Sequence, residues 1–356
     1  MSAPDKESGR LVEPVGHGEW LEGLWRAARS GRLPHGLLFH GNEGVGKYVA
    51  ARWFAAGLLC EHGPAAPCRV CGPCKRFASG NHGDVFEVDA RAHGLDALTV
   101  AFFAPRRERS SSGYQGPSVG EFLSLRPAEG GMRVVLVREA ERMNVPAQNA
   151  FLKTLEEPSP GTVIVLETSQ VGKLLATIQS RVVSVAVPAP PRAAATAVLA
   201  AHGIDAEEGA EYVRMAAGSP GRALRHAHQN RLVMRGLLLQ RLQGAIGIAE
   251  ARSRFFEMDG DFPGKTAAAQ TRARVACLFD LGLELLRDAE RLHAGVPEGE
   301  LAHNDGVRLL AGLPRSARRA LAERWLGLAA DVELNLGAET LFDRALLDLP
   351  SPAVTR

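Results

Sequence analysis

The feature that most constrains this chain is the run Gly41-Asn42-Glu43-Gly44-Val45-Gly46-Lys47-Tyr48, a phosphate-binding loop that is complete up to its lysine. In the pattern G-x-x-x-x-G-K-[ST], backbone N–H groups close around phosphate, the lysine reaches the terminal phosphates and the last hydroxyl ligates Mg²⁺. Tyr48 stands in place of that hydroxyl, and a phenol at the end of a rigid ring cannot hold the metal there. The sequence therefore predicts a degenerate nucleotide site, in which ATP binding stays open and Mg²⁺ is not expected.

The segments around this loop predict an α/β domain. Residues 37–39 have the composition of a short strand, and residues 48–59 that of a helix. Further β-rich runs follow, separated by helical or loop segments, at residues 85–88, 133–137, 163–166 and 182–187. Short apolar runs that alternate with helices favour a buried, mainly parallel sheet, here of five strands.

Proline marks a second change along the chain. The run Val187-Pro188-Ala189-Pro190-Pro191 ends the last strand candidate, and the sequence after it is rich in alanine and leucine and almost free of strands. We expect three domains: a phosphate-loop domain over residues 1–187 with an insertion at 60–74, a small helical domain over 188–230, and a longer helical domain over 231–356. Residues 104–118 look like a solvated loop, which is favoured over a phosphate or DNA contact by Arg106, Arg107 and Arg109.

Charge and hydropathy exclude some classes of partner. The chain has 42 Lys and Arg against 40 Asp and Glu, so no global basic field indicates nucleic acid, and any DNA contact must be local or supplied by other subunits. No apolar run approaches the roughly 18 residues that span a bilayer. We therefore expect a cytoplasmic protein with no membrane contact.

Four of the five cysteines lie close together, at Cys60, Cys68, Cys71 and Cys74. Zn²⁺ prefers four ligands in a tetrahedron, and closely spaced cysteines among glycine and proline can supply them. Four thiolates would leave no open position for water, so the spacing predicts a structural zinc site. His62 could replace one cysteine, although an exposed loop histidine is the preferred interpretation, and Cys277 is expected to be an ordinary buried thiol.

The ends of two strand candidates bear on phosphate chemistry. ATPases of this kind place one carboxylate on Mg²⁺ and a second beside the attacking water at the end of a strand. Here Arg138 stands in place of the metal ligand, and Glu139 remains at the position of the water-activating residue as a base that we expect to be inactive. At the end of the next strand, the hydroxyls of Thr168 and Ser169 could approach a γ-phosphate, or cap the following segment.

Three runs resemble the AAA+ subunits of bacterial clamp loaders. The longest, Asn149-Ala150-Phe151-Leu152-Lys153-Thr154-Leu155-Glu156-Glu157-Pro158, matches that family's signature with phenylalanine in place of one leucine. Residues 33–39 before the phosphate loop and residues 121–127 before the degenerate acidic strand are also similar to it. Together with the cysteine insertion, the resemblance covers nearly all of the first 190 residues.

At several motif positions this chain differs from the motor subunits of that family, and these differences resemble those of one other class of subunit. The motor subunits, gamma and tau, have an intact phosphate loop, an aspartate before the glutamate and a sensor arginine in the second domain. Here Gly221 stands at the sensor position, so the chain is similar to the delta-prime or stator class, which carries the zinc module. Ser180-Arg181-Val182 matches the first two positions of the family's serine-arginine-cysteine motif, and residues 334–347 are similar to the end of its collar.

The resemblance implies a RecA-like AAA+ domain, a helical lid and a helical collar within a ring that loads the sliding clamp onto primed DNA. Its implied partners are the gamma or tau motor subunits and the delta subunit. The expected role is a scaffold without its own hydrolysis that supplies Arg181 as an arginine finger to a neighbour. An active gamma- or tau-like ATPase using Lys47 and Glu139 is the alternative, and a zinc-bearing P-loop kinase has less support.

Overall fold

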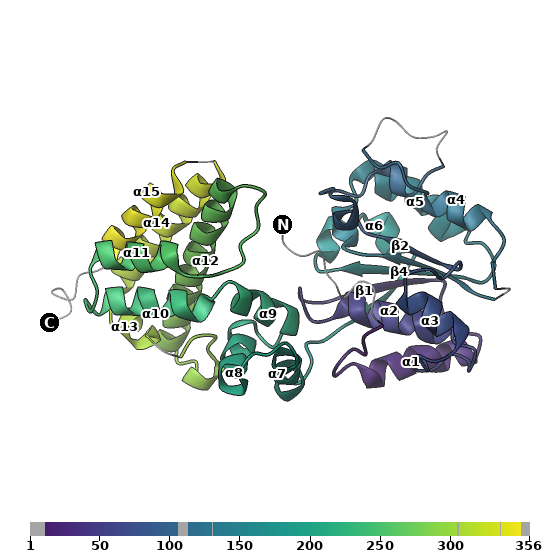
Figure 1. Ribbon diagram of the computed structural model, residues 1–356, viewed down its shortest axis with the longest axis horizontal. Helices are drawn as coiled ribbons and strands as arrows, with labels where there is room; N and C mark the ends of the chain where they lie inside the picture. The colour runs from purple at the N-terminus through teal and green to yellow at the C-terminus, as the bar shows by residue number, and fades with distance from the viewer. Residues whose placement is uncertain (1–10, 106–112, 130, 305, 335, 350–356) are drawn as a thin grey trace. The chain divides into compact units, whose positions relative to one another are not determined.

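The computed structural model describes residues 11–105, 113–129, 131–304, 306–334 and 336–349 (Figure 1). Arg106, Arg107 and Arg109 of the predicted solvated loop lie outside these residues. The chain forms two compact units that divide between Ala194 and Ala195. The expected boundary at residue 230, within the second unit, stays a prediction.

The first unit contains a five-stranded sheet in the order β2-β3-β4-β1-β5, and every pair of neighbours is parallel. Its strands are β1 (Gly36–His40), β2 (Val85–Val88), β3 (Arg133–Val137), β4 (Thr162–Thr168) and β5 (Val183–Ala186). This confirms the predicted sheet. Because β1 lies between β4 and β5, the loop that follows β1 meets the carboxyl end of β4.

Helices cover both faces of this sheet (Figure 1). The face that β1 presents through Leu37 and Phe39 packs against Trp25 and Phe54, which belong to two of the helices on that side. These helices are α1 (Gly18–Arg29), α2 (Lys47–Leu58) and α3 (Gly72–Ala78). The opposite face packs Leu38 into a core that contains Phe151, and it carries α4 (Val119–Ser124), α5 (Val145–Glu156) and α6 (Ala176–Gln179).

Polar side chains cap two of the helices in this unit, α4 and α5. Ser118 and Glu121 form a reciprocal capping box at the start of α4, and the Asn144 side chain accepts from the Ala147 N–H at the start of α5. Besides the strands and α-helices, the described residues contain short 3₁₀ turns. They lie at Arg91–His93, Val100–Phe102, Ala140–Arg142, Val171–Lys173 and Glu298–Glu300. The segment before Arg181 is therefore a 3₁₀ turn followed by the single turn of α6.

The described residues of the second unit form helices joined by loops, without a strand. Its helices are α7 (Arg192–Ala201), which begins just before the division, α8 (Ala206–Met215), α9 (Pro220–His228), α10 (Arg231–Leu242), α11 (Ile248–Glu257), α12 (Ala267–His293), α13 (Val307–Ala311), α14 (Arg315–Glu333) and α15 (Ala338–Asp348). One hydrophobic core runs from Ala195 to Leu349. None of the described helices is long and apolar enough to cross a membrane.

A buried polar network joins three segments of this helical unit. Arg231 donates to His226 Nε2 at 2.9 Å and pairs with Glu284 at 3.1 Å, and Glu284 also contacts His303 Nε2 at 3.3 Å. Burial, together with the adjacent Arg231 charge, lowers the pKa of His226 to about 3. Burial alone would raise the pKa of Glu284, but His303 and Arg231 together lower it to about 2. The network therefore has a neutral histidine beside an ion pair.

Candidate functional site

The phosphate loop has the backbone geometry that its glycines predict. Gly44 and Gly46 have φ values of 77° and 96°, a region that favours glycine, and Gly46 is the N-cap of α2. A Cβ on Gly41 would lie 2.3 Å from the Val187 carbonyl oxygen, so only glycine fits beside the strand end there. His17 Nε2 donates to the Val45 carbonyl at 2.8 Å, because its Nδ1 accepts from the Trp20 indole at 3.2 Å.

The Lys47 ammonium group is enclosed by acceptors from its own chain. It donates to the Asn42 carbonyl oxygen and to Ser169 Oγ, both at 2.9 Å, and it pairs with Glu167 Oε1 at 3.2 Å. An ammonium group carries three N–H donors, so these three contacts match its full capacity. Only 3% of Lys47 is exposed. The lysine that would reach a terminal phosphate is thus already bonded.

Glu167 is the functional residue that sequence reasoning missed. It lies on β4 opposite Phe39 of β1, and its second oxygen accepts from the Glu139 N–H at 3.0 Å. Burial raises the pKa of the Glu167 carboxyl above its usual range, and the Lys47 charge opposes this rise. A carboxylate inside an otherwise apolar strand was the available signal, because a buried charge requires a partner.

The two residues at the expected magnesium positions lie against each other. The Arg138 guanidinium lies over the Tyr48 ring, 5.0 Å from its centroid, and it pairs with Asp89 at 3.1 Å. The Tyr48 hydroxyl donates to Glu87 at 2.5 Å. Burial of that hydroxyl, together with the Glu87 charge, raises the pKa of Tyr48 well above its usual range. A cation and an aromatic ring therefore stand where a magnesium-dependent ATPase has a metal-binding hydroxyl and a carboxylate.

The remaining acidic and hydroxyl candidates are held by local contacts. Glu139 has φ of 49°, and its carboxylate pairs with Arg91 at 2.9 Å and with Arg142 at 2.5 Å. Thr168 is fully buried, and its hydroxyl accepts from the Gln170 N–H at 3.0 Å. Of the two hydroxyls at the end of β4, it is therefore Ser169 that contacts Lys47.

Arg181 lies at the opposite end of the strands from Lys47. It lies two residues before β5, which pairs in parallel with β1, whereas the phosphate loop follows the carboxyl end of β1. At about 3.3 Å per residue, the five residues of β1 separate these two ends by roughly 15 Å. The Arg181 guanidinium donates to the Thr177 carbonyl at 2.9 Å and pairs with Glu156 at 2.5 Å, and a third of the side chain is exposed.

The four cysteine sulfurs converge after α2. They lie within 4.8 Å of one another, with Cys60 and Cys71 at 4.0 Å and Cys68 and Cys74 at 4.0 Å. A tetrahedral zinc with Zn–S bonds of about 2.3 Å needs sulfurs about 3.8 Å apart, so this group is compatible with a structural zinc. Backbone N–H groups of Cys71 and Val70 lower the pKa of Cys68 to about 6, which favours the thiolate. His62 Nδ1 lies 3.7 Å from Cys60 Sγ but does not belong to the group of four ligands.

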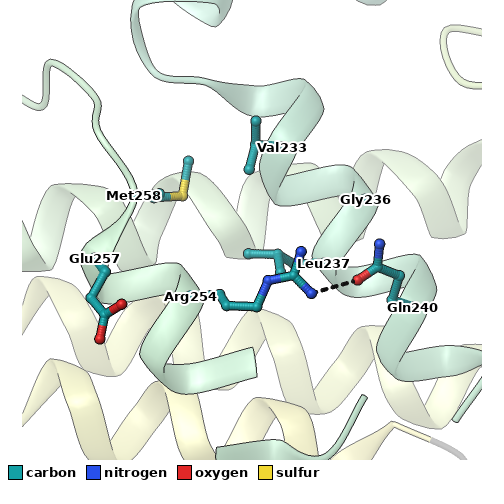
Figure 2. A pocket seen from close by; sticks show the side chains of 7 residues that line it. All are labelled: Val233, Gly236, Leu237, Gln240, Arg254, Glu257 and Met258. Carbon is teal, nitrogen blue, oxygen red and sulfur yellow. Dashed lines mark hydrogen bonds between the residues drawn. The ribbon is translucent and has the colours of Figure 1, made fainter. Parts of the chain in front are cut away.

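The helical unit has a surface hollow of about 430 Å³ between α10 and α11 (Figure 2). Val233, Leu237 and Met258 form its apolar part, and Arg254, which donates to Gln240 at 3.0 Å, crosses it. No residue predicted to carry chemistry lines it.

Sequence comparisons agree with this architecture. A family described as "DNA polymerase III, delta subunit" matches residues 16–191. The delta' subunit of DNA polymerase III from Pseudomonas aeruginosa is 36% identical over 243 residues, covering 67% of this chain and 64% of that protein. The delta' subunit from Bacillus subtilis is 35% identical over 158 residues, which cover 44% and 43% of the two chains. The tau subunit of the same organism is 30% identical over 174 residues, which cover 48% and 28%.

The parallel sheet, the phosphate loop between β1 and α2, the four-cysteine module and the helical second unit define a protein of the RecA-like AAA+ class. Its matches span less than two thirds of the length of each of these relatives. Since residues 16–191 match a DNA polymerase III subunit family and the relatives at 35% to 36% identity are delta' subunits, the chain is a member of the DNA polymerase III delta-prime family.

Proposed function

We propose that this chain is a stator subunit of a bacterial replicative clamp loader that helps to place the sliding clamp on primed DNA without hydrolysing ATP itself. Its partners in this role are the gamma or tau motor subunits and the delta subunit, in the cytoplasm. The observation that carries the proposal is the contact between Tyr48 and Arg138. Two magnesium ligands are replaced by side chains that stabilise each other, so the loss of the metal site is built into the fold.

The phosphate loop lacks the groups that ATP hydrolysis ordinarily needs. Phosphoryl transfer depends on metal ions to neutralise charge that develops on the phosphate, and on a residue that positions water. Arg138 pairs with Asp89, and Glu139 is held by Arg91 and Arg142. Neither group is arranged to bind Mg²⁺ or to orient a nucleophile, which supports a scaffold in preference to the active gamma- or tau-like ATPase.

Arg181 is the residue that we assign to catalysis in a neighbouring subunit. Roughly 15 Å of strand separates it from Lys47 of its own chain, so an action on phosphate at its own loop is ruled out by distance. Its guanidinium is held at the surface by Glu156 and the Thr177 carbonyl. A planar, permanently charged group in such a position suits a γ-phosphate presented by another chain.

Zinc is the cofactor that we propose, held by Cys60, Cys68, Cys71 and Cys74. Four thiolates complete a tetrahedron, so the ion would stabilise the module and take no part in the reaction. The module contacts α2 closely, because a Cβ on Gly57 would lie 2.1 Å from the Ala65 carbonyl oxygen. Zinc binding would therefore also support the helix that begins at Lys47.

An Arg181→Ala variant tests the role in trans. In a loader reconstituted with motor and delta subunits, we expect the turnover of ATP at the site facing this chain to fall by roughly 10³-fold or more, because arginine fingers contribute that much. Clamp- and DNA-stimulated ATP turnover is the measurement. Glu156→Gln removes the ion-pair partner of Arg181 but leaves the charge of Arg181 in place, so it should retain most of the activity.

The isolated chain provides the complementary measurement. ATP turnover near or above about 1 s⁻¹ without partners, the ordinary range of enzymes, would contradict a stator. An unchanged rate in the reconstituted Arg181→Ala loader would instead rule out Arg181 as an arginine finger and leave the proposed scaffold role intact.

A further inference from the structure

The contacts of Lys47 raise the question of what balances its charge. Of its three acceptors, the Asn42 carbonyl and the Ser169 hydroxyl are neutral, and only Glu167 carries a negative charge. The side chains of Lys47 and Glu167 are 2% and 9% exposed. A lysine buried to this degree needs an anion close by, and in a phosphate loop the bound nucleotide ordinarily supplies it.

We propose that Glu167 is an internal anion of the phosphate loop, which holds Lys47 in place of a phosphate oxygen and thereby excludes di- and triphosphates. This inference rests on the proposed non-hydrolysing role and adds the residue that decides what the loop accepts. Glu167 acts through Lys47, so it is a positioning residue for this site.

The position of Glu167 explains how a single carboxylate can do this. β4 lies beside β1 in the sheet, so the end of β4 reaches the loop that follows β1. One oxygen of Glu167 bonds Lys47, and the other accepts from the N–H of Glu139 after β3. From its place on β4, the carboxylate therefore links the segments that follow the two neighbouring strands, β1 and β3, and both of its oxygens are already bonded.

Displacement of this carboxylate by a nucleotide would be unfavourable. A phosphate that took over Lys47 would leave Glu167 buried beside a polyanion, with Glu141 as a further negative charge that already opposes ionisation of Glu167. A buried carboxylate without its partner is destabilising, and like charges at close range repel. Phosphate therefore has to compete with a bonded group and also to tolerate its charge.

The test uses the full chain and inorganic pyrophosphate, titrated by calorimetry without Mg²⁺ and repeated with ATP. We expect no saturable binding by the wild type. Glu167→Gln keeps the size of the side chain and an acceptor for the Glu139 N–H, but it removes the negative charge that pairs with Lys47. This variant should bind pyrophosphate saturably, at least roughly tenfold more tightly than the detection limit set by the wild-type titration, because Lys47 is no longer bonded to a carboxylate.

Two further variants identify the cause of any gain. Glu141→Gln removes a neighbouring negative charge but leaves the pair of Lys47 and Glu167 intact, because Glu141 accepts from the Ser169 N–H. This variant should therefore not bind pyrophosphate saturably, in contrast to Glu167→Gln. Adding Lys47→Ala to Glu167→Gln should abolish the gained binding. Circular dichroism and zinc content confirm that each variant is folded.

The outcomes separate this inference from the proposed function. Saturable wild-type binding of pyrophosphate, or a folded Glu167→Gln variant with no gain, would overturn the internal anion and leave the stator role intact. If Glu167→Gln does not fold, the wild-type titration alone still decides. ATP turnover by the wild type would contradict the stator role directly.

Discussion

His226 shows how one buried side chain can make the helical unit sensitive to acid. It is 4% exposed and its pKa is lowered to about 3, whereas a histidine in an unfolded chain titrates near 6.5. Between these values the unfolded chain binds a proton that the folded chain does not. The contribution of His226 to stability is therefore complete above about pH 6.5 and declines as the pH falls below it.

We expect the free energy of unfolding to decrease by about 1.4 kcal/mol for each pH unit below 6.5 through His226. Glu284, with a pKa near 2, adds a further loss in the same direction only below about pH 4.5. Urea unfolding at pH 7, 6 and 5 measures the slope. His226→Gln should flatten it, and the exposed His202→Gln should leave it unchanged. Equal slopes for wild type and His226→Gln would show that the histidine is not the cause.

At the same scale, the sequence allowed some site residues to be assigned but not their contacts. Tyr48 and Arg138 could be recognised as replacements because their positions are fixed relative to a motif and a strand end. Their stacking on each other depends on the order of the strands, which no local pattern contains. Glu167 was missed because a motif describes the residues that bind phosphate and gives no information about a carboxylate that replaces it.

Among the elements, short apolar strands were the most predictable. β3, inside the sheet, and β2, at its edge, both have the predicted bounds, since a polar residue or a turn on each side of an apolar run indicates where the strand ends. β4 is longer than its apolar run, because it extends through Glu167 and Thr168. These polar residues can remain in a buried strand only because Lys47 and a backbone N–H satisfy them, which is tertiary information.

The packing of α12 on α14 makes a prediction about a glycine. A Cβ on Gly282 would lie 1.7 Å from the Trp325 ring, a distance that requires the helices or the ring to move. Overpacking of this kind costs about 1–3 kcal/mol, so Gly282→Ala should lower the thermal midpoint. Gly327 on α14 has nothing within 4 Å of its Cβ position. Gly327→Ala should therefore raise the midpoint through better helix propensity, and a loss in both variants would argue against the packing explanation.

The whole molecule consists of two units whose cores do not share residues. The sheet unit contains the cysteine group and two hydrophobic cores, one on each face of the sheet. The described residues of the helical unit form a single core. A metal held only by the first unit should affect only the stability of that unit.

We therefore expect a strong chelator to remove about one zinc per chain and to lower the unfolding temperature of the sheet unit alone. Scanning calorimetry with and without chelator is the measurement, because a ligand that binds only the folded form shifts the transition of the unit that holds it. Cys74→Ser should reproduce the shift without chelator, whereas Cys277→Ser in the helical unit should retain the metal. Purified protein with well under one zinc per chain would rule out the site.

The pairing of Lys47 with Glu167 also has a consequence for the response of this chain to the cellular concentrations of ATP and ADP. A partner on the same chain acts at an effective concentration on the order of millimolar or higher, which does not vary with metabolism. A loop closed in this way cannot register the ratio of ATP to ADP. In the clamp loader that we propose, such a subunit would keep one conformation while its partners bind and hydrolyse ATP, and it would give them a constant surface.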